Sequence, residues 1–347
     1  MLAFRTIIAF LAAGLLANGA VHAQQQVKPG VVIFATGGTI AGTAKSSIDT
    51  TTYRSSTLEV QSLIDAVPEI REVATVTGEQ ISNVGSPDVD QSILLRLARE
   101  INRSLADPGV HGVVVTHGTD TLEETAFFLD LTTAGTKPVV IVGAMRPTTA
   151  ISADGPMNLL QAITLAASRD ADNRGVMIVL NDRIGSAFYT TKMNTTSLDA
   201  FRATEQGYLG MFIGVKPRFY YSPAIPRGKL TFNVNGVNSF PKVPIIYSYE
   251  DQDADQIDAA LRAGAKGIVI AGSGNGATPL SVRKRLIELT SQGFPIVLST
   301  RTGGGFSTRS VEGIASGIFN PQKSRILLML ALAQGADVPT IRNYFHE

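Results

Sequence analysis

Threonine and glycine residues follow two apolar segments of this chain. The first segment, Val31–Ala35, precedes Thr36-Gly37-Gly38-Thr39, and the second, Gly112–Val115, precedes Thr116-His117-Gly118-Thr119-Asp120. A threonine hydroxyl becomes a nucleophile when a base or a lowered pKa activates it. Glycines let the backbone turn sharply and approach a ligand closely. The two segments therefore predict one site that uses hydroxyl chemistry.

A carboxylate and an amine accompany these hydroxyls. Asp120 follows Thr119 directly, a pair that suits the binding of an ammonium or amide group and a proton relay. A lysine can act as a general base if burial lowers its pKa, and Lys192 follows an apolar segment and lies among hydroxyl side chains. Two simpler interpretations remain open: Asp120 or Thr121 caps a helix, and Lys192 is an ordinary surface lysine.

Other chemistries find little support in the sequence, so we expect no metal and no cofactor. The chain has no cysteine, and its four histidines lack the spacing of a zinc site. No GxSxG motif is present, and neither glycine-rich turn has the Walker lysine. Gly272-Ser273-Gly274-Asn275-Gly276 lacks the third spaced glycine of a dinucleotide-binding turn. The acidic run Glu250–Asp255 could bind a cation, but we favour a role at a helix N-terminus.

The N-terminal segment has the features of a cleaved signal peptide over residues 1–23. Arg5 precedes an apolar stretch from Thr6 to about Ala20, and Val21-His22-Ala23 is a small-x-small cleavage signal. A membrane anchor is the alternative, although the apolar stretch is short for a span. Without Arg5 the numbers of basic and acidic residues are equal. A neutral chain without a basic run argues against nucleic acid or a membrane surface as a partner.

The length and the order of the apolar segments predict two α/β domains. A chain of 347 residues exceeds what one hydrophobic core usually serves. Continuous apolar segments indicate strands buried on both faces, and helical periodicity alternates with them. We therefore predict a larger N-terminal domain (27–217) with a mostly parallel, doubly wound sheet, a proline- and glycine-rich linker (218–240), and a smaller C-terminal domain (241–347) with a flavodoxin-like parallel sheet.

The predicted elements are the following. Strands are expected at Val31–Ala35, Val113–Val115, Val139–Val142, Val176–Leu180, Val243–Tyr247, Gly267–Ala271 and Pro295–Ser299. Helices are expected at Leu58–Val67, Ile93–Ile101, Asn158–Ala167, Asp255–Ala263, Leu280–Gln292 and Ser324–Leu332, with Asp90 as the N-cap of the second. Ligands of such sheets bind beyond the carboxyl ends of the strands, where both threonine-bearing turns lie.

Ala35-Thr36-Gly37-Gly38-Thr39-Ile40-Ala41-Gly42 and Thr116-His117-Gly118-Thr119-Asp120-Thr121-Leu122-Glu123-Glu124-Thr125 together resemble the two signatures of bacterial L-asparaginases. Further matches are Gly143-Ala144-Met145-Arg146-Pro147, Ser152-Ala153-Asp154-Gly155-Pro156, Asn158, Lys192, Asn194-Thr195-Thr196 and Asn320-Pro321-Gln322-Lys323. The resemblance extends from about Val31 nearly to the C-terminus. The signal peptide is similar to that of the type II, periplasmic branch. The absence of cysteine and the segment Ser299–Gly305 resemble the glutaminase-asparaginases.

The resemblance implies hydrolysis of L-asparagine, and of L-glutamine, through an acyl-enzyme. Thr39 would be the nucleophile and Tyr53 its partner on a flexible loop. Thr119, Asp120 and Lys192 would form a second group that relays a proton and binds the amino end of the substrate.

Substrate-binding residues are implied as well. Gly38 would lie beside the nucleophile, Ser86 would hold the α-carboxylate, and the Ala144 carbonyl would lie near the amide. Asn275 would reach into the site of a neighbouring subunit, because members of this family are homotetramers built from intimate dimers, without metal or cofactor.

Two segments depart from the family pattern. Pro87 follows Ser86, where relatives often carry a glutamine or glutamate that contacts the substrate amine. The segment Thr302–Glu312 is short, and Glu312 is the nearest candidate for the acid expected across the subunit interface. Both departures predict that recognition of the amine depends on Asp120.

Two rival functions remain open. A periplasmic amino-acid binding protein without catalysis would also have two α/β domains, export and a cleft, but the intact threonines and lysine favour an enzyme. A nucleotide-dependent enzyme is a third possibility, for which the glycine patterns give little support.

Overall fold

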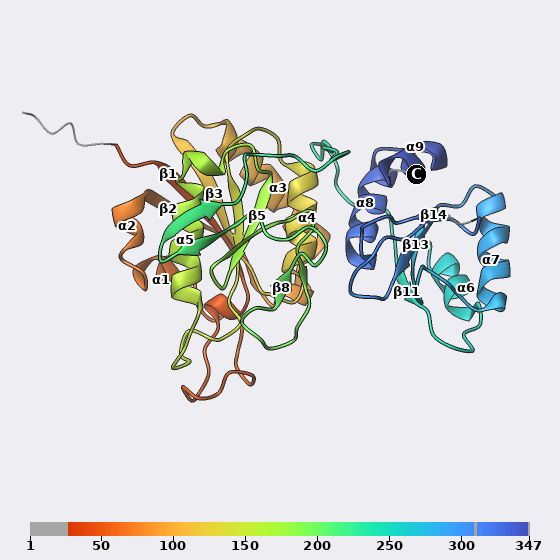
Figure 1. Cartoon of the computed structure of the whole chain (residues 1–347), viewed down its shortest axis with the longest axis horizontal. Coiled ribbons are helices and arrows are strands. Elements are labelled where there is room, and N and C mark those ends of the chain that lie inside the picture. Colours follow the sequence, from red (N-terminus) through yellow and green to blue (C-terminus); the bar gives the residue numbers. More distant parts are fainter. Residues whose placement is uncertain (1–26, 309–310, 346–347) are drawn as a thin grey trace, which may run out of the picture.

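The computed structural model describes residues 27–308 and 311–345, which form two α/β domains side by side (Figure 1). The predicted signal peptide lies outside the described residues. Among these residues, eight strands form the N-terminal sheet in the order β10-β9-β6-β5-β4-β3-β1-β2, and four form the C-terminal sheet. The prediction of two α/β domains with a larger, mostly parallel N-terminal sheet is therefore confirmed.

The N-terminal sheet is parallel at its centre and antiparallel at one side. Its parallel strands are β1 (Gly30–Gly37), β2 (Thr75–Val84), β3 (Val110–Thr116), β4 (Val139–Val142) and β5 (Val176–Leu180). The antiparallel strands are β6 (Arg183–Ser186), β9 (Gly210–Ile213) and β10 (Lys216–Phe219). A separate two-stranded sheet contains β7 (Thr191–Lys192) and β8 (Phe201–Arg202).

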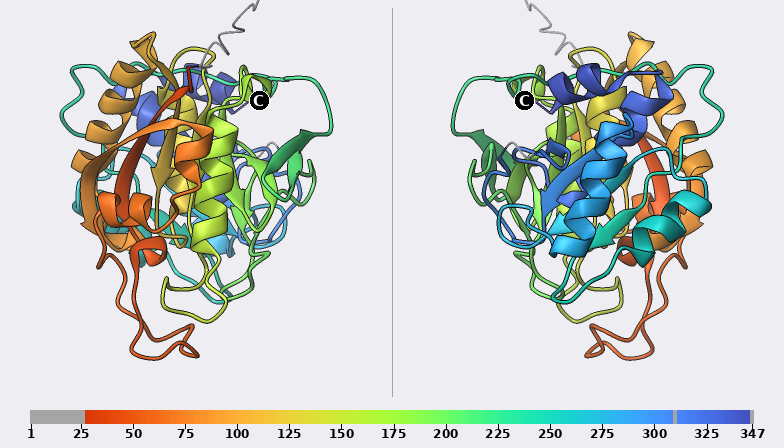
Figure 2. Two further views of the ribbon diagram at one scale, coloured as in Figure 1. Left: turned by 90° about the vertical axis from the view of Figure 1, so that its left-hand side faces the viewer. Right: turned by 90° about the vertical axis from the view of Figure 1, so that its right-hand side faces the viewer.

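Helices cover both faces of this sheet, as the apolar character of its central strands predicts. One face carries α1 (Val60–Asp65), α2 (Ile70–Val73) and α5 (Gly155–Ala166), which pack on Ile33, Val114 and Val140. The other face carries α3 (Gln91–Ala106) and α4 (Leu122–Thr132), which pack on Phe34, Val113 and Ile141 (Figure 2). Asp90 caps α3 as predicted, because its carboxylate accepts hydrogen bonds from the amides of Ser92 and Ile93.

The strand order reverses between β1 and β3. The chain runs from β1 to the edge strand β2 and then returns to β3, on the other side of β1. The carboxyl ends of β1 and β3 therefore lie side by side, with Ala35 paired to Thr116. Such a switch of strand order opens a crevice for ligands in doubly wound sheets. Both threonine-bearing turns follow these two strands.

The C-terminal sheet has the order β11-β12-β13-β14, which follows the chain. Its strands are β11 (Ile245–Tyr247), β12 (Ile268–Gly272), β13 (Ile296–Thr300) and β14 (Ile314–Ala315). On one face lie α6 (Asp255–Arg262) and α7 (Leu280–Ser291), and on the other lies α8 (Pro321–Ala333), followed by α9 (Val338–Tyr344). Because α8 also packs against α4, these two helices join the cores of both domains (Figure 1).

Some elements differ from the sequence-based predictions. The strand β2 was not predicted, because most of its side chains are polar and lie at least partly exposed at the edge of the sheet. The helix α8 begins three residues before Ser324, since the Asn320 side chain accepts a hydrogen bond from the Lys323 amide and caps it. The first residues of the segment predicted as a linker continue the edge strand β10.

Candidate active site

The two glycine turns touch one another at the carboxyl edge of the sheet. A Cβ atom added to Gly38 would lie 2.2 Å from the Gly118 nitrogen, a distance that no side chain tolerates. Gly37 and Gly38 also have φ angles of 112° and 84°, which favour glycine. The glycines therefore bring the turn after β1 into contact with the turn after β3, and thereby place Thr39 and Thr119 on adjoining segments.

Thr39 begins a short 3-10 helix (Thr39–Ala41) and is almost completely buried. Its hydroxyl lies 2.7 Å from the Tyr53 hydroxyl. Tyr53 belongs to a largely exposed segment that returns to the turn through paired backbone hydrogen bonds between Thr43 and Arg54. The structure therefore brings together the nucleophile and partner that the resemblance implied.

Lys192 joins the second group. Its Nζ donates to the Thr119 hydroxyl at 2.9 Å and lies 2.7 Å from the Asp120 carboxylate. The Lys192 side chain is 13% exposed and that of Asp120 67% exposed, so a largely buried amine contacts an exposed carboxylate. These contacts do not fit an ordinary surface lysine, because Lys192 is largely buried and binds Asp120. They do not fit a capping role for Asp120 or Thr121 either, because the N-cap of α4 is Thr121 and its side chain makes no capping hydrogen bond.

Ser86 lies against the same turn. It begins the 3-10 helix Ser86–Asp88, and a Cβ atom added to Gly118 would lie 2.9 Å from its Oγ. The Thr121 hydroxyl donates to the Ser86 carbonyl at 2.7 Å, which ties this segment to the start of α4. Pro87 occupies the first turn of the short helix, next to Ser86.

His117 was not predicted to have a role, yet it is the most deeply buried titratable group of this turn. Its Nδ1 donates to the Gly118 carbonyl at 2.7 Å, so Nε2 accepts from the Thr125 hydroxyl at 2.9 Å. Burial lowers the pKa of His117 to about 4. The neutral ring therefore holds the Gly118 carbonyl and connects the turn to α4.

Ala144 lies two residues after the end of β4, beside the turn that carries Thr119. A Cβ atom added to the preceding residue, Gly143, would lie 3.0 Å from the Thr119 methyl group. The Asn158 side chain donates to the Gly143 carbonyl at 3.1 Å, and Asp154 accepts from the Met145 amide at 2.9 Å. These bonds fix the backbone on both sides of Ala144.

Asn275 and Glu312 lie in the C-terminal domain and do not join this group. The Asn275 side chain donates to the Thr308 hydroxyl at 2.6 Å and accepts from its amide at 2.9 Å. Glu312 forms an ion pair with Arg283 of α7 at 2.9 Å. Both contacts lie within the C-terminal domain of the same chain.

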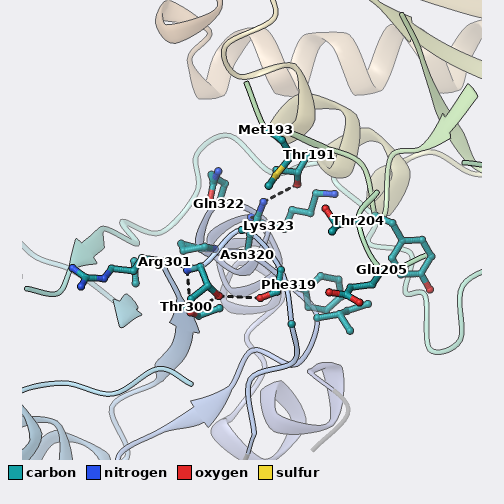
Figure 3. Close-up of a pocket in the computed structure, with 18 of the residues that line it drawn as sticks. Thr191, Met193, Thr204, Glu205, Thr300, Arg301, Phe319, Asn320, Gln322 and Lys323 are labelled. Carbon is teal, nitrogen blue, oxygen red and sulfur yellow. Dashed lines mark hydrogen bonds between the residues drawn. The ribbon is translucent and has the colours of Figure 1, made fainter. Parts of the chain in front are cut away.

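A cavity of about 460 Å³ lies between the two domains on the Lys192 side (Figure 3). Lys192 and Thr191 line it from the N-terminal domain, whereas Thr300, Arg301 and Asn320 line it from the C-terminal domain. Thr39 and Thr119 do not line this cavity, so it is a separate space that adjoins the two turns through Lys192.

Within residues 27–308 and 311–345 there is no cluster of three or more acidic or histidine side chains that could hold a metal ion. The acidic run includes a hydrogen bond from the Asp255 amide to the Asp253 carboxylate at the start of α6, as expected for acids at a helix N-terminus. No helix within the same ranges has the length and apolar character needed to cross a membrane.

Comparisons with known proteins agree with the geometry. The family model described as "Asparaginase, N-terminal" matches residues 30–225, and "Glutaminase/Asparaginase C-terminal domain" matches residues 242–345. The structure is similar to that of a probable cytoplasmic L-asparaginase from Campylobacter jejuni, with a TM-score of 0.88, 43% sequence identity, and coverage of 92% of this chain and 99% of that one.

Similar sequences come from several organisms. L-asparaginase 2 of Bacillus subtilis is 49% identical, over 92% of this chain and 86% of its own length. A probable periplasmic L-asparaginase of Haemophilus influenzae is 42% identical, over 92% of this chain and 93% of its own. Both family models match in order and together cover most of the described residues. On this basis, the chain belongs to the asparaginase family.

Proposed function

We propose that this enzyme hydrolyses the side-chain amide of L-asparagine, and that of L-glutamine, to the corresponding acid and ammonia. One observation carries the proposal: the Thr39–Tyr53 pair and the Thr119–Asp120–Lys192 group lie on adjoining turns at the reversal of strand order. Relatives named L-asparaginase, which are 49% and 50% identical in sequence over most of this chain, support the same substrate.

The hypothesised first half-reaction forms an ester on Thr39. Its Oγ attacks the amide carbon, and the hydroxyl proton passes through Tyr53, whose oxygen is 2.7 Å away, toward the leaving nitrogen. The C–N bond then breaks, and ammonia leaves. Backbone N–H groups of the glycine turns suit the stabilisation of the oxyanion, because no side chain obstructs the approach there.

The second half-reaction needs water and a base. Lys192, with Thr119 and Asp120, is the group that we assign to this proton transfer. Water attacks the ester carbon and gives a proton to the Lys192 amine, which must be uncharged to accept it. The bond between this carbon and the Thr39 oxygen then breaks, the acid is released, and the proton returns from Lys192 to the Thr39 oxygen. Asp120 also has an exposed carboxylate that can bind the substrate ammonium.

Substrate placement is assigned to residues around the two turns. The Gly38 backbone is assigned a contact with the substrate, Ser86 suits the α-carboxylate, and the Ala144 carbonyl is assigned to the amide end. Asn275 bonds within its own domain in the single chain. Its assignment to the site of a neighbouring subunit, in a homotetramer of intimate dimers, rests on the family resemblance. We further infer that the enzyme is exported to the periplasm, from the signal features of residues 1–23.

The test is ammonia release by the mature chain from asparagine and from glutamine, with kcat/KM measured for each, since discrimination is the ratio of these constants. We expect turnover of both amides. Binding of asparagine without ammonia release would instead identify an amino-acid binding protein. Subunit mass in solution tests the tetramer, and fractionation of the cells that produce the full chain tests export.

A further inference from the structure

A buried carboxylate lies behind the second group of the site. Glu123 is in the first turn of α4, three residues after Asp120, and is only 3% exposed. Its Oε2 accepts hydrogen bonds from the Thr191 hydroxyl at 2.6 Å and from the Asn320 side chain at 3.0 Å. Gln322 donates to its other oxygen at 3.4 Å. The carboxylate therefore binds one segment of each domain.

A buried ammonium group holds the same region from the C-terminal domain. Lys323 of α8 is fully buried, and its Nζ donates to the carbonyls of Ala187, Phe188 and Thr190 at 2.9 to 3.0 Å. Burial lowers the pKa of Lys323 to about 8, so the group is still mostly charged at neutral pH and can donate all three protons.

Most of these contacts end on the segment that leads to Lys192. Lys323 binds its main chain as far as Thr190, and Glu123 and Asn320 bind the Thr191 hydroxyl. Lys192 is the next residue, and its amine reaches Thr119 and Asp120 at the start of the helix that carries Glu123. Figure 3 shows Thr191, Asn320 and Lys323 side by side at the junction of the domains.

We propose that four residues fix the main chain at Lys192 in the position from which its amine reaches Thr119. This positioning cluster consists of Glu123, Thr191, Asn320 and Lys323. It makes the C-terminal domain of the same chain a determinant of the geometry of Lys192. The proposal goes beyond the assigned function and depends on the assignment of Lys192 as the base. A cluster that only joins the domains would affect stability but would have no specific link to Lys192.

The first experiment compares two variants of the half-buried Thr191 with a control variant at a second threonine. Thr191→Val removes the hydroxyl that binds Glu123 and keeps the side-chain shape, whereas Thr191→Ser keeps the hydroxyl. The control Thr132→Val removes another buried hydroxyl of the N-terminal domain, which donates to the Phe128 carbonyl within α4. We expect kcat to fall about tenfold for Thr191→Val, with KM within about twofold, to recover in Thr191→Ser, and to stay unchanged in Thr132→Val.

A double-mutant cycle then separates positioning from a general structural effect. In a Lys192→Met background, Thr191→Val should lower kcat by less than about twofold, because its effect acts through the missing amine. An equal loss in both backgrounds, or an unchanged kcat in Thr191→Val alone, would overturn the proposal. If Lys192→Met itself keeps the normal kcat, the assigned base is wrong and the positioning proposal falls with it.

A second variant covers the case in which Thr191→Val does not fold. Asn320→Ser retains a good helix N-cap but loses the amide that donates to Glu123 and Thr191. We expect the same loss of kcat at constant KM, again absent from the Lys192→Met background. A normal kcat in folded Asn320→Ser would contradict the cluster.

Discussion

The two halves of the proposed active site are built in different ways. The Thr39 half comes from one short stretch of chain: the turn after β1 and the largely exposed segment that carries Tyr53. The Lys192 half combines three segments that are distant in sequence, from β3 and α4, from β7, and from α8 of the other domain. Its supporting groups Glu123, His117 and Lys323 are buried.

The two halves are therefore expected to differ in how easily they open. A segment whose side chains are largely exposed opens at a lower free-energy cost than buried, mutually bonded groups, which move only with the domain core. The Thr39 half is therefore the one expected to rearrange when substrate enters. The Lys192 half provides a fixed frame.

Removal of the nucleophile is expected to have the largest effect. Thr39→Val keeps the shape of the side chain but removes the oxygen to which we assign the attack, so no ester should form and kcat should fall on the order of 10⁴-fold or more. Asparagine binding, measured by calorimetry, should remain within about tenfold. A folded variant with near-normal ammonia release would remove Thr39 from its assigned role.

Lys192→Met tests the fixed half. General base catalysis contributes typically about 10²- to 10⁴-fold, so we expect kcat to fall by about 10³-fold while KM changes much less. The measurement is steady-state ammonia release together with thermal unfolding of both proteins. An unchanged rate would exclude Lys192 as the base and leave the Thr39 half as the only chemically active one.

How much the sequence predicted also differs between the two halves. The Thr39 turn was recognisable because an apolar strand, two glycines and a threonine are adjacent in the chain. Val139–Val142 and Val176–Leu180 were predicted at their observed bounds, since central parallel strands have uninterrupted apolar character. Local patterns of this kind need no knowledge of distant contacts.

The Lys192 half was accessible mainly through the family resemblance. Taken alone, Lys192 had the features of a surface lysine, because its partners Thr119 and Asp120 lie more than 70 residues away. Glu123 had the features of an acid in a first helical turn, and nothing in its neighbourhood indicated that Asn320 of another domain would bind it. Tertiary burial of charged groups has no local periodic signal.

The buried His117 makes the stability of the Lys192 half sensitive to acid. Its pKa is about 4 in the folded chain against an ordinary value of 6.5, so between these pH values the unfolded chain holds a proton that the folded chain lacks. The free energy of unfolding should therefore fall as pH decreases from 6.5 to 4, by about 3 kcal/mol from this group, and level off below. Urea unfolding at several pH values, with His117→Gln as the reference, measures the contribution of His117 to the free energy of unfolding.

An NMR titration of the imidazole provides the control for this prediction. The His117 ring signals should stay at their neutral positions down to about pH 5 in the folded protein. A ring that titrates near 6.5 would show that the turn after β3 admits water, and the contrast between a fixed and an adaptable half would then be lost.

The smallest expected effect comes from Tyr53→Phe. The variant keeps the ring and loses the hydroxyl that lies 2.7 Å from Thr39 and to which we assign the proton relay, so kcat should fall about 10²-fold, the lower end of what general acid–base groups contribute. Stability should change little because the segment is largely exposed. Tyr221→Phe, which loses a hydroxyl bonded to the Tyr208 carbonyl, is the matched control and should leave kcat unchanged. If Tyr53→Phe lowers the melting temperature and leaves kcat unchanged, this segment has a structural role like that of the Lys192 half. The adaptable half must then lie elsewhere.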